Sequence, residues 1–263
     1  MSTAETLAAN LPTLRRYARA LSGSQNSGDA YIAATLEAIV EDPTILKSEH
    51  SEKASLYKAF TRIWGSIDLN DRADPGDAVG LHLGEITPAP RQAFLLTALE
   101  GFPEDETADI LGVSVADVRQ LVEECGRELA AEIATDVLII EDEPMIAMEL
   151  ETLVLGLGHK VTGIARTRSE AVLLASSWQP GLILADIRLA DESSGLDAVN
   201  DLLKSFEVPV IFITAYPERY LTGERPEPTF LVTKPFEPSM VSAVISQALF
   251  FQRNARKAAR PAA

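Results

Sequence analysis

Five short apolar runs, each separated from the next by an amphipathic stretch, fill the second half of the chain. The runs DVLII, KVTGIA, GLILAD, VPVIFIT and TFLVT start at residue 136 and alternate with helical patterns such as PMIAMELETLVLGL and PSMVSAVISQALFF. Apolar runs of this length that alternate with helices are typical of parallel strands covered on both faces. Residues 136–256 are therefore predicted to form an α/β doubly wound domain with five parallel strands.

Polar residues stand where these predicted strands end. Glu141 and Asp142 follow the first strand, Asp186 ends the third, Thr214 ends the fourth and Lys234 follows the fifth. Functional groups of a doubly wound sheet gather beyond the carboxyl ends of its strands, so these five side chains are expected to meet. Three clustered acids need a hard cation such as Mg²⁺, and a lysine and a hydroxyl suit the oxygens of a phosphoryl group.

This arrangement, ED…D…T…KPF on a five-strand α/β pattern, resembles the receiver domain of two-component response regulators over roughly the last 125 residues. The resemblance implies a flavodoxin-like (CheY-like) sheet, phosphorylation of Asp186, and Mg²⁺ as cofactor. It implies four protein ligands for that ion: Glu141, Asp142, Asp186 and the backbone carbonyl of Arg188.

The same resemblance makes Thr214 the switch hydroxyl and Lys234 the phosphate-binding lysine, with a cis bond between Lys234 and Pro235. Two departures from the family pattern are visible. Leu231 stands where most receivers have an aromatic switch residue. A glycine and two prolines end any fourth helix by about Leu221.

Other interpretations of these residues exist. A lone acid at a strand end is more often a helix cap, and a lone Lys-Pro is more often a turn. A haloacid dehalogenase-type phosphatase also uses Asp, Thr, Lys and Mg²⁺, but it needs a second acid two residues after the nucleophile, where this chain has Arg188. Five matched positions in the expected order favour the receiver.

The first half of the chain has a different rhythm and is predicted to be all-α. Apolar residues recur at helical spacing, as in Leu11, Leu14, Ala18 and Leu21. Ser27 and Ser51 are candidate helix N-caps, and residues 65–90, rich in Gly, Asp and Pro, are predicted to form a long connection.

A predicted helix-turn-helix lies at residues 104–130, with a helix from Glu104 to Leu111, a turn at Gly112 and a second helix from Ser114. Together with the upstream helices it resembles a small extracytoplasmic-function sigma factor. The resemblance places a region 2-like part at about 8–66 and a region 4-like part at about 88–132, within a domain spanning 1–132.

Charge argues against DNA binding by this helical half. The chain carries a formal net charge of −16, and residues 1–135 hold 11 Lys and Arg against 22 Asp and Glu. Residues 104–132 hold nine acids and two bases. Such a surface is repelled by a nucleic acid duplex and by anionic membranes, so the scaffold of a sigma factor is expected without its DNA binding.

A receiver joined to a sigma-like domain resembles the PhyR-type response regulators of the general stress response. The resemblance implies a cytoplasmic, non-enzymatic anti-anti-sigma factor with three contacts: a histidine kinase or phosphotransfer protein, a NepR-like anti-sigma factor, and an intramolecular contact between its own domains. Two alternatives stay open: a DNA-binding response regulator that acts directly as a transcription factor, and a plain helical bundle whose acidity aids solubility. The single Cys125 and three scattered histidines indicate neither a disulfide nor a zinc site.

Overall fold

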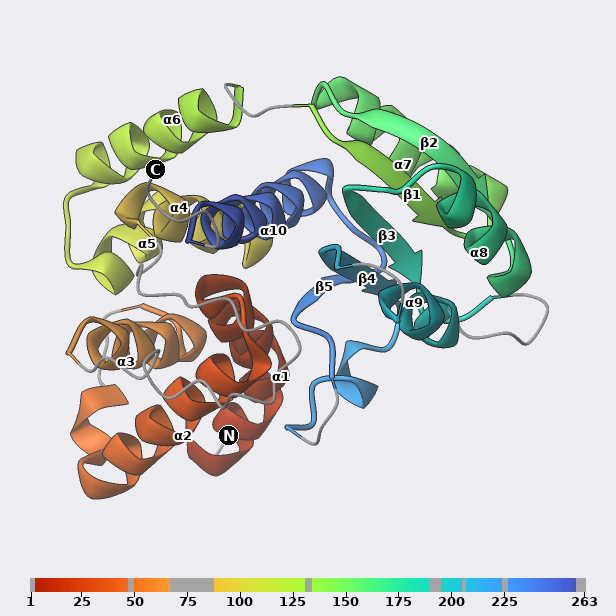
Figure 1. Ribbon diagram of the computed structural model, residues 1–263. Coiled ribbons are helices and arrows are strands. Elements are labelled where there is room, and N and C mark those ends of the chain that lie inside the picture. The colour runs from red at the N-terminus through yellow and green to blue at the C-terminus, as the bar shows by residue number, and fades with distance from the viewer. Residues whose placement is uncertain are drawn as a thin grey trace.

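The computed structural model describes residues 3–46, 50–66, 88–130, 134–189, 195–204, 207–223 and 227–258. The N-terminal half is helical, as predicted (Figure 1). Its elements are α1 (Thr3–Ser22), α2 (Gln25–Glu41), the short turn η1 (Pro43–Leu46), α3 (Glu52–Ser66), α4 (Ala89–Phe94), the π-helical turn η3 (Leu95–Leu99), α5 (Glu104–Leu111) and α6 (Val115–Ala130). Most of the predicted connection at 65–90 lies outside the described residues.

The predicted helix boundaries are confirmed in part. Helix α5 ends at Gly112, whose φ of 69° is the left-handed conformation that favours glycine, and α6 follows at once, so the helix-turn-helix is present. Ser51 caps α3, because its Oγ accepts a hydrogen bond from the Ala54 N–H at 3.1 Å. The prediction for Ser27 is wrong: Ser24, which has an extended backbone, caps α2 and accepts the N–H of Ser27, so the helix starts earlier.

The C-terminal half is a five-stranded parallel sheet with strand order β2-β1-β3-β4-β5. Its elements are β1 (Asp136–Ile140), α7 (Pro144–Gly156), β2 (Lys160–Ala165), α8 (Arg168–Ser177), β3 (Leu182–Asp186), α9 (Gly195–Leu203), β4 (Val210–Thr214), the short turn η4 (Pro217–Arg219), β5 (Phe230–Thr233) and α10 (Pro238–Ala258). This order is the flavodoxin-like topology, which confirms the predicted fold class.

Alternate residues of the strands feed two separate cores. On one face of the sheet, Ile139, Leu184 and Ile213 belong to the core that α7 and α10 complete. On the other face, Leu138, Ile183 and Phe212 pack with residues of α8 and α9. Side chains of a strand point to opposite faces in turn, so these apolar runs bury both faces of the sheet.

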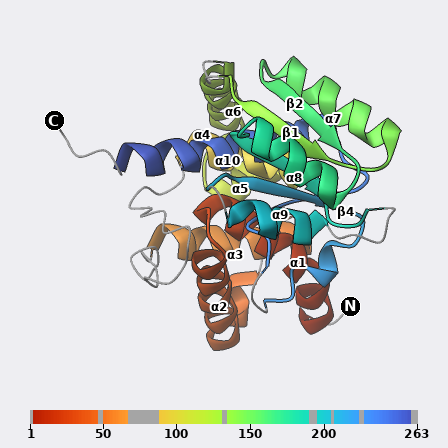
Figure 2. The ribbon, with the colours of Figure 1, turned by 45° about the vertical axis from the view of Figure 1, so that its right-hand side comes forward.

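Helix α10 joins the two halves. It lies at the centre of the molecule, between the sheet and helices α1 and α4 (Figure 1), and Figure 2 shows the same position from a second side. Residues Val241 to Leu249 of α10 are buried almost without interruption, apart from Ser242, which is half-buried. A helix that is apolar on nearly all sides must be covered on all of them, and the first core accordingly runs from the sheet through α10 into the helical half.

The neighbouring residues Phe250 and Phe251 both take part in the contact between α10 and the helical half. Phe251 is 1% exposed, and its ring lies where a side chain on Gly23 would have to go, 2.8 Å from an ideal Cβ position. Its neighbour Phe250 lies under the guanidinium of Arg91, with 4.5 Å between Arg91 Cζ and the ring centre. Both aromatic rings thus contact the helical half. A separate finding is that no helix in the described residues is long and apolar enough to span a bilayer.

Candidate functional site

Three carboxylates meet at the carboxyl end of the sheet. Glu141 follows β1, Asp142 comes next, and Asp186 ends β3; one oxygen from each lies within 4.8 Å of the others. Glu141 is fully buried and Asp186 is 7% exposed. The short strands β1 and β3 are direct neighbours, which brings residues 45 positions apart in the chain to one point.

Lys234 neutralises part of this acidic cluster. Its Nζ lies 2.7 Å from Asp186 Oδ2 and 2.9 Å from Glu141 Oε2. Burial alone would lower the pKa of Lys234, but the hydrogen bonds to Asp186 and Glu141 outweigh it and raise that pKa. Burial raises the pKa of Glu141, and the nearby Lys234 opposes this effect without cancelling it.

The donor set fits a hard divalent cation. The cluster offers only carboxylate oxygens, which are the ligands that Mg²⁺ prefers, and Asp142 is half-buried and so open to the water molecules that Mg²⁺ retains. Arg188 lies directly beside the cluster, because its backbone N–H donates to Asp186 Oδ1 at 3.1 Å. One lysine cannot balance three acids, so the cluster has charge left for a cation.

The remaining predicted residues also reach this end of the sheet. Thr214 is 1% exposed, and its Oγ1 accepts the N–H of Tyr216 at 3.2 Å. The bond between Lys234 and Pro235 is cis, as predicted. Position 231, where an aromatic switch residue would stand, is a leucine that is buried in the sheet.

Sequence reasoning missed two features at the rim of the site. Glu143, two residues after Glu141, lies 3.5 Å from Lys234 Nζ. The ring of Tyr216 contacts two guanidinium groups, with Arg188 Cζ at 5.8 Å and Arg219 Cζ at 4.9 Å from the ring centre. The adjacency of Glu143 to the acidic pair was a signal in the sequence, whereas the contacts of Tyr216 depend on loop geometry.

The other missed residues are arginines on α1 that hold the C-terminal half. Arg19 is fully buried, and its Nη2 donates to Glu227 Oε2 at 2.6 Å and to Asp29 at 3.0 Å. Arg15 Nη1 donates to the carbonyl of Leu221 at 3.0 Å. Burial would raise the pKa of Glu227, but hydrogen bonds from Thr222 and Arg19 lower it below its ordinary value.

A third arginine ties α4 to α10. Arg91 is 2% exposed, and its Nη1 donates to Ser246 Oγ at 2.8 Å and to the Ser246 carbonyl at 3.3 Å. Buried arginines with two or three partners are typical of specific interfaces, because leaving such a charge unpaired is costly. The β5–α10 side of the C-terminal half is therefore a built contact surface for the helical half.

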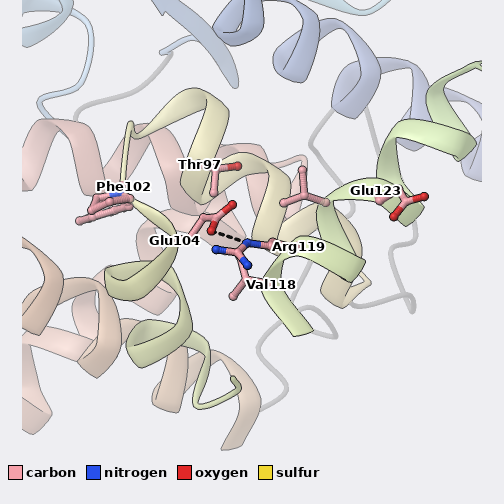
Figure 3. Close-up of a pocket in the computed structure, with 8 residues that line it drawn as sticks. Thr97, Phe102, Glu104, Val118, Arg119 and Glu123 are labelled. Carbon is pink, nitrogen blue, oxygen red and sulfur yellow. Dashed lines mark hydrogen bonds and ion pairs between the residues drawn. The ribbon is translucent and has the colours of Figure 1, made fainter. Parts of the chain in front are cut away.

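A separate hollow lies on the helical half, away from the carboxylates. It has a volume of about 390 Å³ and is lined by residues of η3, α6 and the start of α5, including Phe102 and Val122. Arg119 reaches across it to Glu104, with 2.7 Å between Nε and Oε2 (Figure 3). Apart from Arg119, its charged rim is acidic, with Glu104 and Glu123, which agrees with a surface that repels DNA.

Three family models match consecutive parts of the chain. Residues 7–61 match the Sigma2 domain of PhyR, residues 83–132 match the sigma-like domain of the response regulator PhyR, and residues 137–246 match the response regulator receiver domain.

Relatives match over nearly the full length. The phyllosphere-induced regulator PhyR of Methylorubrum extorquens is 65% identical over 261 residues, which cover 98% of both chains. The crystal structure of the response regulator PhyR from Brucella abortus is 50% identical, covers 99% of both chains and superposes with a TM-score of 0.88. The structure described as anti-anti-sigma factor PhyR from Bartonella quintana is 52% identical, covers 98% of this chain and all of the other, and has a TM-score of 0.88.

Proposed function

Because this chain belongs to the PhyR family of response regulators, we propose that it is an anti-anti-sigma factor whose activity is controlled by phosphorylation of Asp186. In this function the helical half binds an anti-sigma factor of the NepR type and so frees the stress sigma factor. The main support is the near full-length relation to a protein described as an anti-anti-sigma factor.

The proposed division of labour follows the two halves. Residues 1–132 form the sigma-like output, with the region 2-like part at about 8–66 and the region 4-like part at about 88–132. Residues 136–256 form the receiver. The partners of these domains are an anti-sigma factor for the output and a histidine kinase or phosphotransfer protein for the receiver.

The phosphoryl step is assigned to the carboxylate cluster. A carboxylate oxygen of Asp186 attacks the phosphorus of a phosphohistidine, the P–N bond breaks, and the donor histidine keeps the electron pair and takes up a proton. Lys234 and the hydroxyl of Thr214 then contact the new phosphoryl oxygens. Mg²⁺, held by Glu141, Asp142, Asp186 and the backbone carbonyl of Arg188, would neutralise negative charge during the transfer.

Without phosphate the receiver covers the output surface. The buried contacts of Arg19 and Arg91 with the C-terminal half support this role, because they join the segment before β5 and helix α10 to the helical half. Phosphate on Asp186 can weaken this closed arrangement only by stabilising a receiver conformation that fits the helical half less well.

Direct action on a promoter is the weaker alternative. The helix that would enter the major groove, α6, carries exposed Asp117, Glu124 and Glu128, and its Arg119 is engaged with Glu104. Recognition helices need basic side chains for phosphate contacts. A protein interface therefore agrees better with these residues than a DNA interface does.

The function can be tested by sigma factor release. A complex of the cognate sigma and anti-sigma factors is mixed with the full chain, with and without beryllofluoride and Mg²⁺, and free sigma factor is measured by its binding to core polymerase. The proposal predicts release only with beryllofluoride, and no release by the Asp186→Ala variant. Release that is equal in all samples, or absent from all of them, contradicts the proposal.

A further inference from the structure

We propose that Thr233 and Arg16 form the connection through which phosphorylation at Asp186 loosens the two halves. This inference rests on the proposed function and adds to it the residues through which phosphorylation would regulate the output. In the closed arrangement the hydroxyl of Thr233 accepts a hydrogen bond from Arg16, and Arg16 in turn donates to the buried Glu100 of the helical half. A movement at the end of β5 breaks this first bond.

Thr233 is coupled to both groups expected to bind phosphate. It precedes Lys234 in the chain, and it is the register partner of Thr214 in the parallel pair β4–β5. The backbone N–H of Lys234 donates to the Thr214 carbonyl at 2.8 Å, which ties the two strand ends together. A change in either Thr214 or Lys234 therefore acts on the backbone of Thr233.

The side chain of Thr233 contacts the helical half, whereas the side chain of Lys234 contacts the carboxylates. Successive side chains of a strand point to opposite faces, so Lys234 reaches the carboxylates while Thr233 reaches the helical half. There its Oγ1 accepts a hydrogen bond from Arg16 Nη1 at 3.1 Å. Thr233 thus contacts the helical half while its chain neighbour contacts Asp186.

Arg16 is buried and shares its donors between the two halves. It is 7% exposed; Nε and Nη2 donate to Glu100 Oε1 at 3.1 and 2.8 Å, and Nη2 also donates to the Leu99 carbonyl at 3.3 Å. Thr233 accepts the hydrogen bond of the remaining nitrogen, Nη1. Loss of the Thr233 hydroxyl would leave part of a buried cation without this partner, which is costly in a low-dielectric setting.

Glu100 links the contact between Thr233 and Arg16 to the rest of the helical half. Its side chain is fully buried; Oε2 accepts the hydroxyl of Tyr57 at 2.7 Å, and its backbone carbonyl accepts from Lys53 at 2.8 Å. Arg16 is on α1, Tyr57 and Lys53 are on α3, and Glu100 follows η3. The Arg16–Glu100 pair therefore joins the region 2-like and region 4-like parts, and the receiver touches that pair directly.

The test removes the hydroxyl and keeps the shape, by Thr233→Val in the full chain. Valine is isosteric and suits a strand. A hydrogen bond to a charged group is worth a factor of about ten or more in an equilibrium constant. Without phosphate, deuterium uptake of peptides from α10 and α1 should therefore indicate an opening constant raised about tenfold, and anti-sigma affinity should rise by the same factor. By linkage, beryllofluoride affinity should also rise by that factor.

Two variants act as controls, and two more extend the test. Thr233→Ser restores the hydroxyl and should behave as the unmodified chain. Thr162→Val makes the same change on β2, at the opposite edge of the sheet, and should alter none of these three quantities. Thr233→Ala gives a second test of the hydroxyl if the valine variant melts at a much lower temperature. In an Arg16→Lys background, Thr233→Val should raise the opening constant by a much smaller factor than it does alone, because the two residues act as one unit.

The outcomes separate this inference from the proposed function. If the unmodified chain opens with beryllofluoride but Thr233→Val matches it in every measurement, the Thr233–Arg16 connection is wrong and the function stands. Equal effects of Thr233→Val and Thr233→Ser would also overturn it, since packing would then be responsible. An unmodified chain that does not respond to beryllofluoride contradicts both proposals.

Discussion

Lys234 contacts the carboxylate that is expected to receive the phosphoryl group. Its ammonium bridges Asp186 and Glu141 at 2.7 and 2.9 Å, so the two carboxylates are held in place before any phosphate arrives. A phosphoryl group on Asp186 would add negative oxygens within reach of the same ammonium. The lysine must then divide its hydrogen bonds differently, and this is the change that we propose is passed to the end of β5.

At this scale we predict that Asp142→Ala abolishes phosphorylation while the fold stays intact. Removing one of the three expected carboxylate ligands of Mg²⁺ should slow transfer about 100-fold or more. The measurement is the rate of phosphate uptake from a phosphorylated donor, with circular dichroism to check the fold. Glu149→Ala is the matched control, because this acid is exposed on α7 and lies outside the cluster. A normal rate in Asp142→Ala would show that the acidic pair is wrongly assigned.

The residues of the carboxylate cluster could be found from the sequence because the carboxyl ends of parallel strands always meet at one edge. Glu141, Asp186 and Lys234 each follow an apolar run, and that position alone brings them together. The arginines of α1 could not be found in the same way. Helical periodicity tells which face of α1 is buried, but it does not tell that Arg16 and Arg19 are buried against a second domain.

Helix α10 is the element that both halves share. Its apolar residues face the sheet on one side and the helical half on the other, which explains why it is buried on nearly all sides. Phe250 and Phe251 are adjacent, and adjacent helical residues cannot both enter one core. Both rings contact the helical half.

We predict that Phe251→Ala destabilises the closed arrangement. Removing a fully buried Phe leaves a cavity and costs about 3–5 kcal/mol. Because the ring lies against Gly23 as well as Phe230, part of this loss should appear as opening of the two halves. Thermal unfolding and deuterium uptake of α1 would measure it. Leu155→Ala, on the exposed face of α7, should change stability by no more than about 0.5 kcal/mol; an equally small change in Phe251→Ala would contradict the prediction.

The segment before β5 shows how a sequence departure becomes a contact. Glycine and proline residues predicted that a fourth helix could not extend past Leu221, and the described part of this segment contains only the short turn η4. Its backbone is then available to α1, because Arg15 binds the Leu221 carbonyl and Arg19 binds the Pro228 carbonyl and Glu227. The lost helix is thus replaced by an interface.

For the whole molecule, the charge of the helical half predicts its choice of partner. The fragment 1–135, with a net charge of −11 from 11 basic and 22 acidic residues, should not bind a promoter at physiological salt. A gel shift with excess competitor DNA is the measurement. Specific, competitor-resistant binding would contradict the protein-partner function and favour a transcription factor.

The sequence predicted both folds but only part of their arrangement. Periodicity and strand-end residues are local signals, and they located the receiver and the helix-turn-helix. The contact between the halves depends instead on buried pairs such as Arg19–Glu227 and Arg16–Thr233, whose members are more than 200 residues apart in the chain. No spacing rule relates such residues, so the structure was needed to find them.

The most direct test of control by the receiver is the affinity for a cognate anti-sigma factor, compared among the unphosphorylated full chain, the chain with beryllofluoride, and the fragment 1–135. If the receiver controls the output, binding should be weak, tight and tight, in that order. If the closed form outnumbers the open form about 99 to 1, the affinity should rise roughly 100-fold on opening. Asp186→Ala should stay weak with beryllofluoride present, and circular dichroism should show a helical fragment. Equal affinity for all three proteins would contradict the account, because the receiver would then exert no control over the output.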